Sequence, residues 1–206
     1  MVQDDDKFFE YQANRGFPMS GFLHNQILDL IPDGGNAIDI GAHVGIWSRQ
    51  LVKKFDEVWS WEPIESNCEC LRVNVPEAKI IPFAAASVQK KKGFMEPDKE
   101  GNYGGYQLGH KGEEVIVKVV DDFDFKRVKF IQMHIKGYEY DAMLGCRKTL
   151  QIHKPMVVYQ AYDHQMEMYG HSVEELDKLL TDLGYHIVED HKFRQWDITY
   201  KVSQIL

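Results

Sequence analysis

Two acidic residues stand at the ends of two neighbouring apolar segments in the first third of the chain. The first, Asp39, lies in the segment AIDIGAHVG, where Gly41 and Gly45 let the backbone approach a ligand closely. The second, Glu62, ends the next apolar segment, near the roughly 20-residue spacing at which an acid reaches a ribose diol. A carboxylate that accepts both ribose hydroxyls makes two charge-assisted hydrogen bonds, each contributing about 1.5–3 kcal/mol. The pattern predicts a nucleoside site.

The glycine turn differs from the dinucleotide fingerprint, because its spacing is Gly41-x-x-x-Gly45 and a third glycine is missing. An anion at Asp39 would repel a pyrophosphate, whereas it can accept hydrogen bonds from an ammonium group. S-adenosylmethionine has an ammonium, a ribose and no phosphate, so the turn favours it over NAD. The alternative is a flavodoxin-like turn without a nucleotide, in which both glycines only relieve packing.

Composition limits the class of protein. A chain of 206 residues with 44% hydrophobic residues suits a single domain. The net charge of -8 argues against a nucleic-acid binder, and the basic run Lys90–Lys92 is interpreted as a solvated loop. No stretch of 18 apolar residues indicates a membrane span. Three cysteines cannot all pair and no secretory segment opens the chain, so a reducing, cytoplasmic location is expected.

No metal site is expected. Cys68 and Cys70 lie two residues apart on a predicted helix, where side chains at this spacing point in different directions. Four histidines are spread over the second half of the chain without metal-ligand spacing, namely His164, His171, His186 and His191.

The predicted elements alternate between strand and helix, which is typical of a parallel sheet. Strands are predicted at 37–40, 57–61, 78–84, 115–120, 128–135 and 155–160, and helices at 45–54, 64–73 and 138–150. A glycine- and lysine-rich insertion between Ser87 and Glu114 interrupts the alternation, and so long a connection is usually functional or mobile. Ser172–Glu175 forms a capping box for a helix that Gly184 ends, and 185–189 and 196–201 are predicted as an antiparallel pair.

The expected organisation is therefore a lead-in over residues 1–35, with a helix near 21–30, followed by one domain over 36–206 that carries the insertion at about 87–114. No internal repeat or linker divides the chain.

Four blocks between about Asn36 and Gln160 resemble the FkbM-like branch of class I S-adenosylmethionine-dependent methyltransferases. They are Ile38–Gly45 (IDIGAHVG), Trp61–Asn67 (WEPIESN), Phe83–Ser87 (FAAAS) and Phe130–Glu139 (FIQMHIKGYE). Their order and intervals are much more specific than one glycine turn. The resemblance implies a Rossmann-like, doubly wound α/β fold whose mostly parallel seven-stranded sheet has an antiparallel C-terminal edge. It also implies that the cofactor lies over the carboxyl ends of the first two strands.

The resemblance assigns the turn to the methionine moiety, Glu62 to the ribose and the Ala84–Ala85 region to the adenine. His43 stands where the family more often has Asn, and either side chain can donate or accept a hydrogen bond. Trp47 either walls the methionine pocket or packs in the core. The cofactor residues expected in this way are Asp39, Gly41, Ala42, His43, Gly45, Trp47, Glu62, Pro63, Ala84 and Ala85.

The fourth block departs from the family pattern. The family usually has Asp at the position of His134 and Glu at the position of Lys136, and an acid is common near Gln160. An anionic pocket has thus become neutral or cationic. His134 can serve as a catalytic base at neutral pH, since imidazole titrates near 6.5, or it can be a substituted scaffold position.

Acceptor binding is expected from Lys136, Gln160 and from His164, which lies just beyond the last parallel strand. Tyr103 and Tyr106 in the insertion either cover the acceptor or anchor the insertion to the core. The resulting hypothesis is methyl transfer from S-adenosylmethionine to an oxygen, less readily a nitrogen, of a sugar or other small metabolite. The acceptor class rests on the resemblance alone. The rival hypotheses are a cofactor-binding module that has lost catalysis and, less favoured, an NAD-dependent oxidoreductase.

Overall fold

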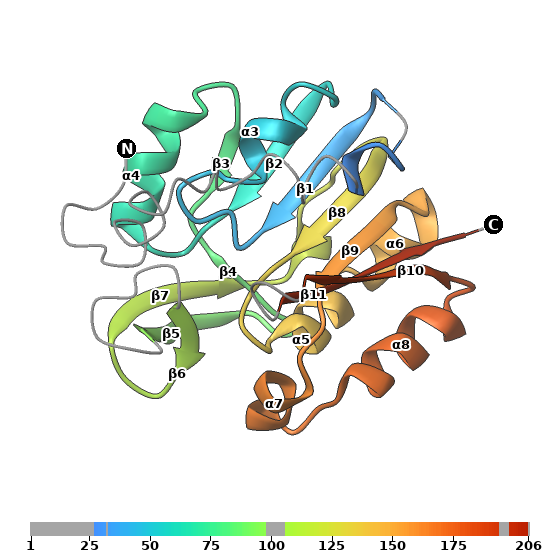
Figure 1. Ribbon diagram of the computed structural model, residues 1–206. Helices are drawn as coiled ribbons and strands as arrows, with labels where there is room; N and C mark the ends of the chain where they lie inside the picture. Colours follow the sequence, from blue (N-terminus) through green and yellow to red (C-terminus); the bar gives the residue numbers. More distant parts are fainter. Residues whose placement is uncertain (1–26, 32, 98–105, 194–197, 206) are drawn as a thin grey trace.

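The computed structural model describes residues 27–31, 33–97, 106–193 and 198–205. Its largest feature there is a seven-stranded sheet with the strand order β10-β11-β9-β8-β1-β2-β3 (Figure 1). The strands are β1 (Asn36–Ile40), β2 (Glu57–Trp61), β3 (Lys79–Ile81), β8 (Val128–Met133), β9 (Met156–Gln160), β10 (His186–Phe193) and β11 (Ile198–Gln204). Five neighbouring strands of this sheet are parallel, namely β9, β8, β1, β2 and β3, whereas β11 and β10 are antiparallel at one edge. The predicted fold class is confirmed.

Helices cover both faces of this sheet. They are α3 (Ser48–Leu51), α4 (Glu65–Asn74), α5 (Glu139–Leu144), α6 (Arg147–His153), α7 (Asp163–Met166) and α8 (Val173–Asp182), with 3-10 turns η2 (Val120–Asp122) and η3 (Glu167–Tyr169). Ala37 of β1 shares a core with Leu51 of α3, whereas Ile38 shares a second core with Ala142 of α5. Neighbouring strand residues point to opposite faces, so the alternation builds two cores and leaves the carboxyl ends of the strands at one edge.

Two predicted helices differ from the observed ones. The helix predicted at 45–54 is shortened to α3, because Gly45 has a φ of 97°, which no α-helix accommodates. The helix predicted at 138–150 is divided into α5 and α6. The start of α6 is stabilised by the carboxylate of Asp121, which accepts the backbone N–H groups of Lys148 at 2.6 Å and Thr149 at 2.8 Å. These are donors that a new helix leaves unpaired.

The elements near the carboxyl terminus agree with the prediction. The Ser172 side chain accepts the N–H of Glu175 at 3.2 Å, and the Glu175 carboxylate accepts the N–H of Ser172 at 2.9 Å. This capping box opens α8 as predicted. The antiparallel pair is also present, with β10 and β11 extending beyond the predicted bounds.

The segment predicted as an irregular insertion forms a second sheet, which lies below the first in Figure 1. Its strands are β4 (Ala84–Ala85), β5 (Lys90–Pro97), β6 (Tyr106–Gly109) and β7 (Glu113–Lys118), in the order β4-β7-β5-β6. The strand predicted at 78–84 therefore ends at Ile81. The strand predicted at 115–120 is present as β7, which begins two residues earlier and ends at Lys118. β5 and β6 escaped prediction because they lack a buried apolar pattern, and β5 begins with three lysines.

Most of the predicted lead-in, including most of the helix near 21–30, lies outside the described residues. Ile27, Leu28 and Ile31 are described and pack into the core on the α3 face. Among the helices that the structure describes, none combines the length and the apolar character needed to cross a bilayer. The boundary between residues 35 and 36 stays a prediction.

Candidate active site

The turn between β1 and α3 is attached to the end of β2 through its backbone. The N–H groups of Gly41 and Ala42 donate to the carbonyl of Trp61, at 3.0 and 2.9 Å. The N–H of His43, a residue with a φ of 52°, donates to Oε2 of Glu62 at 2.9 Å. The predicted methionine turn and the predicted ribose acid are thus one hydrogen-bonded unit.

Packing alone accounts for both glycines of this turn. Gly41 has a φ of 84°, and a Cβ atom there would lie 2.3 Å from the carbonyl oxygen of His134. Gly45 has a φ of 97°, and its Cβ would lie 2.7 Å from the side chains of Leu71 and Val75. A side chain at either position meets atoms that cannot move away cheaply, so the glycines are required whether or not a ligand also approaches the turn.

Glu62 is held in place by three N–H donors. Its side chain is buried, with only 5% of the residue exposed. Besides the His43 N–H, the carboxylate accepts the backbone N–H of Ile64 at 3.0 Å and Nδ2 of Asn67 at 3.1 Å. Burial raises the pKa of Glu62 to about 7, although these hydrogen bonds act in the opposite direction. A carboxylate has about four lone-pair sites, so Glu62 can still accept a hydrogen bond from a ligand hydroxyl.

Asp39 is fully buried on the face of the sheet that α3 covers. Its Oδ2 accepts the hydroxyl of Ser48 at 2.5 Å, and the Ser48 hydroxyl lies 2.8 Å from that of Ser60. Its Oδ1 has no hydrogen-bond partner among the described residues. Burial raises the pKa of Asp39 to about 7, and the charge of Glu62 contributes in the same direction. One oxygen of Asp39 therefore remains available to a donor such as an ammonium group.

The other predicted cofactor residues have different surroundings. Trp47 is 5% exposed, and its ring lies 6.3 Å from that of Phe130 between centroids, so the structure places it in the core. Pro63 follows Glu62 and is half-buried. Ala84 and Ala85 are buried in β4 of the second sheet, rather than at the end of the third parallel strand as predicted.

The catalytic candidate His134 directly follows β8. Its N–H donates to the carbonyl of Ile40 at 3.0 Å, which continues the pairing of β8 with β1 by one residue. The residue is half-buried. Two residues later, Lys136 has a φ of 56°, so the chain turns sharply in the left-handed region at this point.

Glu139 braces the loop that contains Lys136. Its carboxylate accepts the N–H groups of Ile135 and Gly137, both at 2.8 Å. Burial raises the pKa of Glu139 to about 7, while the backbone donors and the nearby Lys136 act in the opposite direction. These contacts give Glu139 a structural role in the loop.

Two buried glutamines lie near the ends of β8 and β9. Gln132 is fully buried and pairs in register with Asp39 of β1. Neither its Oε1 nor its Nε2 has a hydrogen-bond partner within the described ranges. Gln160 ends β9 and is 2% exposed, and its Oε1 likewise has no partner there. Sequence reasoning identified Gln160 but missed Gln132, whose signal is a polar side chain inside an otherwise apolar strand.

The remaining predicted acceptor residues that the structure describes lie on elements other than β8. Tyr106 begins β6 and packs beside the cluster that contains Ile64 and Ala84. His164 is exposed on α7, with its ring 5.3 Å from that of Tyr162 between centroids. Tyr103 lies outside the described residues.

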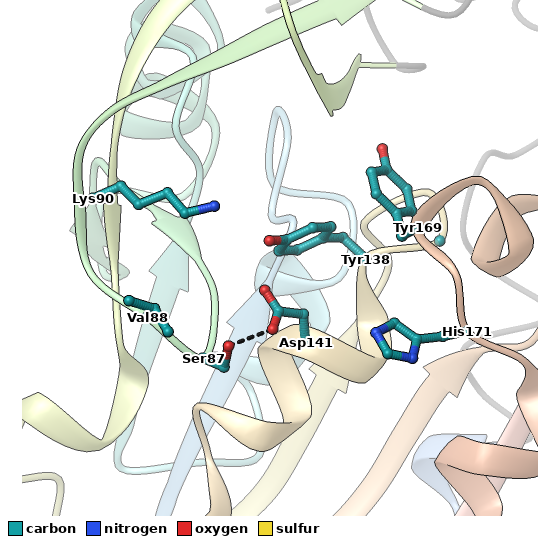
Figure 2. Close-up of a pocket in the computed structure, with 8 residues that line it drawn as sticks. Ser87, Val88, Lys90, Tyr138, Asp141, Tyr169 and His171 are labelled. Carbon is teal, nitrogen blue, oxygen red and sulfur yellow. Dashed lines mark hydrogen bonds between the residues drawn. The ribbon is translucent and has the colours of Figure 1, made fainter.

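A pocket of 360 Å³ lies beside these elements, and sequence reasoning did not identify it. Figure 2 shows its side chains, which come from the segment between β4 and the first residue of β5, from the end of the β8–α5 loop and the first turn of α5, and from η3 and the segment that follows it. The lining residues are Ser87, Val88, Lys90, Gly137, Tyr138, Asp141, Tyr169 and His171. Because these segments are far apart in the sequence, no local motif marks the pocket.

Comparison with protein families decides the identity of the domain. The family described as "Methyltransferase FkbM domain" matches residues 39–187, which is well over half of the chain. The chain belongs to the FkbM methyltransferase family. This family is part of the class I S-adenosylmethionine-dependent methyltransferases, and the match confirms the resemblance noted in the sequence.

Solved structures share the fold. The FkbM methyltransferase of Methylobacillus flagellatus is 20% identical with a TM-score of 0.62, and the match covers 90% of this chain and 48% of that one. This chain thus spans about half of that relative. The N-methyltransferase NodS of Bradyrhizobium japonicum, in complex with S-adenosylhomocysteine, has a TM-score of 0.56, 12% identity and coverage of 91% and 88%. TrmK of M. capricolum, in complex with the same product, has a TM-score of 0.53 and 13% identity, and the match covers 91% of this chain and 68% of that one. No curated protein matches.

The cofactor of the FkbM family is S-adenosylmethionine, and the chemistry of the β1 and β2 ends fits it. Asp39 Oδ1 would accept a hydrogen bond from the cofactor's ammonium group, and the remaining acceptor capacity of Glu62 would take a ribose hydroxyl.

Proposed function

We propose that this FkbM-family chain transfers the methyl group of S-adenosylmethionine to an oxygen, or less readily a nitrogen, of a sugar or other small metabolite. The observation that carries the proposal is the unit formed by the turn and Glu62, in which His43 N–H and Asn67 hold the acid at the carboxyl edge of the sheet. The net charge of -8 favours a small-molecule acceptor over a nucleic acid.

The chemistry asks little of the protein. Bound S-adenosylmethionine supplies a methyl group made electrophilic by its sulfonium. The acceptor oxygen forms a bond to the methyl carbon as the carbon–sulfur bond breaks, the electron pair stays on sulfur, and the hydroxyl proton leaves to a base. His134, directly after β8, is proposed as that base. The other task of the protein is to hold the acceptor about 3–3.5 Å from the methyl carbon and in line with the bond that breaks.

The first experiment measures binding and turnover separately. Calorimetry with S-adenosylhomocysteine tests the cofactor site, with NAD as the control ligand. Methyl transfer is tested by measuring how fast S-adenosylhomocysteine forms from S-adenosylmethionine in the presence of a panel of sugars and sugar acids. If S-adenosylhomocysteine and S-adenosylmethionine both fail to bind, the proposal is wrong.

His134→Ala tests the base. General-base catalysis contributes about 10²–10⁴-fold, so we expect kcat to fall at least 100-fold while the affinity for S-adenosylhomocysteine is unchanged. His186→Ala, at an exposed position at the start of β10 on the far edge of the sheet, is the matched control and is expected to keep its kcat. Full turnover by His134→Ala would remove the base from the proposal.

A second candidate function is a cofactor-binding module without catalysis. The observation that favours it is the presence of His134, Lys136 and Gln160 where the family usually has acids. In that case S-adenosylhomocysteine binds but no acceptor in the panel increases its release from S-adenosylmethionine. The same two measurements therefore decide between the candidates.

A further inference from the structure

The 360 Å³ pocket is separate from the two buried acids of the cofactor site. Asp39 and Glu62 do not line it. One of its walls nevertheless adjoins the carboxyl edge of the seven-stranded sheet, because Gly137 and Tyr138 follow the end of β8 closely. Ser87, on another wall, follows β4 of the second sheet. The pocket therefore lies where a second molecule could reach the edge at which the cofactor is expected.

The acid of the pocket already has protein partners. The hydroxyl of Ser87 donates to Oδ1 of Asp141, as the dashed line in Figure 2 shows. A hydrogen bond to Asp141 also helps raise the pKa of Tyr138, although burial is the larger cause. The negative charge of Asp141 is thus partly satisfied from two sides.

The cation of the pocket has no such partner. Lys90 makes no ion pair or side-chain hydrogen bond within the described residues, and Figure 2 shows its amino group extending toward Tyr138. Lys92 on the same strand differs, because its Nζ lies 2.7 Å from Oε2 of Glu114. His171 is engaged elsewhere, with its ring stacked 4.0 Å from that of Tyr140 between centroids. Lys90 is therefore the charged group that remains for a ligand.

Two aromatic rings form a fixed wall of the pocket. Tyr138 and Tyr169 contact each other edge to face, with 5.0 Å between ring centroids. The hydroxyl of Tyr169 donates to the carbonyl of Leu108 at 2.7 Å, which ties this wall to the second sheet. Burial raises the pKa of Tyr169 to about 12, so its hydroxyl stays neutral at physiological pH and adds no negative charge. A rigid aromatic surface of this kind suits the flat face of a ring.

We propose that this pocket binds the methyl acceptor, and that the acceptor is a hydroxylated ring carrying a carboxylate or phosphate group that Lys90 binds. The ring packs against Tyr138 and Tyr169, and its hydroxyl groups reach the Ser87–Asp141 pair. This inference rests on the proposed function and adds the charge class of its substrate. It also replaces Lys136 and His164 by Lys90 as the main source of positive charge for the acceptor.

Calorimetry with matched ligands tests the charge class. Glucuronate and glucose 6-phosphate are compared with glucose, and 3,4-dihydroxybenzoate with catechol, all in the presence of S-adenosylhomocysteine. We expect at least one anionic member to bind at least tenfold more tightly than its neutral counterpart. A preference for glucuronate or glucose 6-phosphate over glucose indicates a sugar ring, and a preference for 3,4-dihydroxybenzoate over catechol indicates an aromatic ring. If no anion binds more tightly than its neutral counterpart, the proposal is overturned.

Variants of the two lysines assign the preference to the pocket. Lys90→Gln is expected to weaken anion binding at least tenfold and to remove the preference over the neutral ligand, whereas Lys90→Arg keeps most of both. Lys92→Gln removes the same charge from the same strand outside the pocket and is expected to change affinity by less than about twofold. A preference that survives in Lys90→Gln overturns the proposal.

The affinity for S-adenosylhomocysteine separates this inference from the proposed function. We expect the same affinity for the wild type and Lys90→Gln, because Lys90 is not part of the unit formed by the turn and Glu62. If S-adenosylhomocysteine does not bind to the wild type, the proposed function fails. If it binds but the anion preference is absent, only the inference about the pocket fails.

Discussion

The ends of β1 and β2 and the ends of β8 and β9 lie at the same edge of the sheet, but they satisfy their buried polar groups in different ways. At the β1–β2 end, Glu62 accepts three N–H groups and Asp39 accepts a hydroxyl through Oδ2, so that, of the carboxylate oxygens of these two acids, only Oδ1 of Asp39 lacks a partner within the described residues. At the β8–β9 end, Gln132 and Gln160 have side-chain atoms without a partner in the described part of the chain. A buried polar group without a partner costs about 1–3 kcal/mol.

The β1–β2 end is therefore pre-organised by its own hydrogen bonds, whereas the β8–β9 end has buried amide atoms without partners among the described residues. The donors to Glu62 are mostly backbone N–H groups, which the fold itself positions, so the geometry of the β1–β2 end depends little on any single side chain. Within the described residues, the Gln132 amide and Oε1 of Gln160 have no protein partner, so a ligand or water is expected to supply their hydrogen bonds. The first region is therefore expected to lose stability when it is changed, whereas the second is expected to gain stability and lose binding.

The largest expected effect is at Gly41. We expect Gly41→Ala to lower the free energy of unfolding by about 3 kcal/mol, since the new Cβ meets the His134 carbonyl and the left-handed φ is unfavourable for alanine. Urea unfolding measures the change. Gly34→Ala is the control, because Gly34 has a φ of 81° and nothing lies within 4 Å of the added Cβ, so only about 1 kcal/mol is expected. Equal losses in both variants would show that the close contact with β8 contributes nothing.

The second expected effect is a change of about tenfold in the affinity for S-adenosylhomocysteine between pH 6 and pH 8. The pKa values of Asp39 and Glu62 rise from 3.8 and 4.5 to about 7 on folding. Between about pH 4 and pH 7 the folded chain binds more protons than the unfolded chain, so stability falls as the pH rises and levels off above 7. Binding of an ammonium or ribose requires the ionised acids, so the affinity for S-adenosylhomocysteine changes in the opposite direction.

Calorimetry at pH 6, 7 and 8 measures this dependence. We expect the affinity for S-adenosylhomocysteine to rise about tenfold from pH 6 to pH 8 for each acid that must ionise. Glu62→Gln is expected to bind more weakly at every pH and to show a flatter profile. A wild-type affinity that stays constant over this range would mean that neither acid takes part as a carboxylate.

The smallest expected effect distinguishes the two regions directly. Gln132→Met replaces the unpartnered amide by an apolar side chain of similar size, so we expect the free energy of unfolding to rise by about 1 kcal/mol. Asn67→Leu, at the β1–β2 end, removes a donor to Glu62 and is expected to lower it by about 1–3 kcal/mol. Thermal or urea unfolding of both variants gives the comparison. Destabilisation by Gln132→Met would show that its amide has a partner in the protein.

The sequence predicts the central strands well because they are buried on both faces. Parallel strands of this kind are nearly continuous apolar segments, and the bounds of β2 agree with the prediction at both ends. Prediction fails where tertiary contacts decide. The division between α5 and α6 depends on Asp121, and a Cβ on Gly145 at this division would lie 2.2 Å from the carbonyl of Ala86.

The candidate site was predicted in the same uneven way. Asp39 and Glu62 belong to a local pattern, so their positions at adjacent strand ends follow from the sequence. Lys90, Tyr138 and His171 come from three separate segments. Lys90 reaches the pocket because β5 pairs with β7 in the second sheet. Because that sheet was predicted as an irregular insertion, Lys90 was interpreted as part of a solvated loop.

The contact between Gly41 and residue 134 shows which atoms of residue 134 support the turn. Gly41 packs against the carbonyl oxygen of His134 and not against its imidazole. The main chain of β8 thus supports the turn, and the side chain at position 134 bears none of that constraint. A substitution at position 134 that keeps the path of the main chain therefore leaves this support of the turn in place.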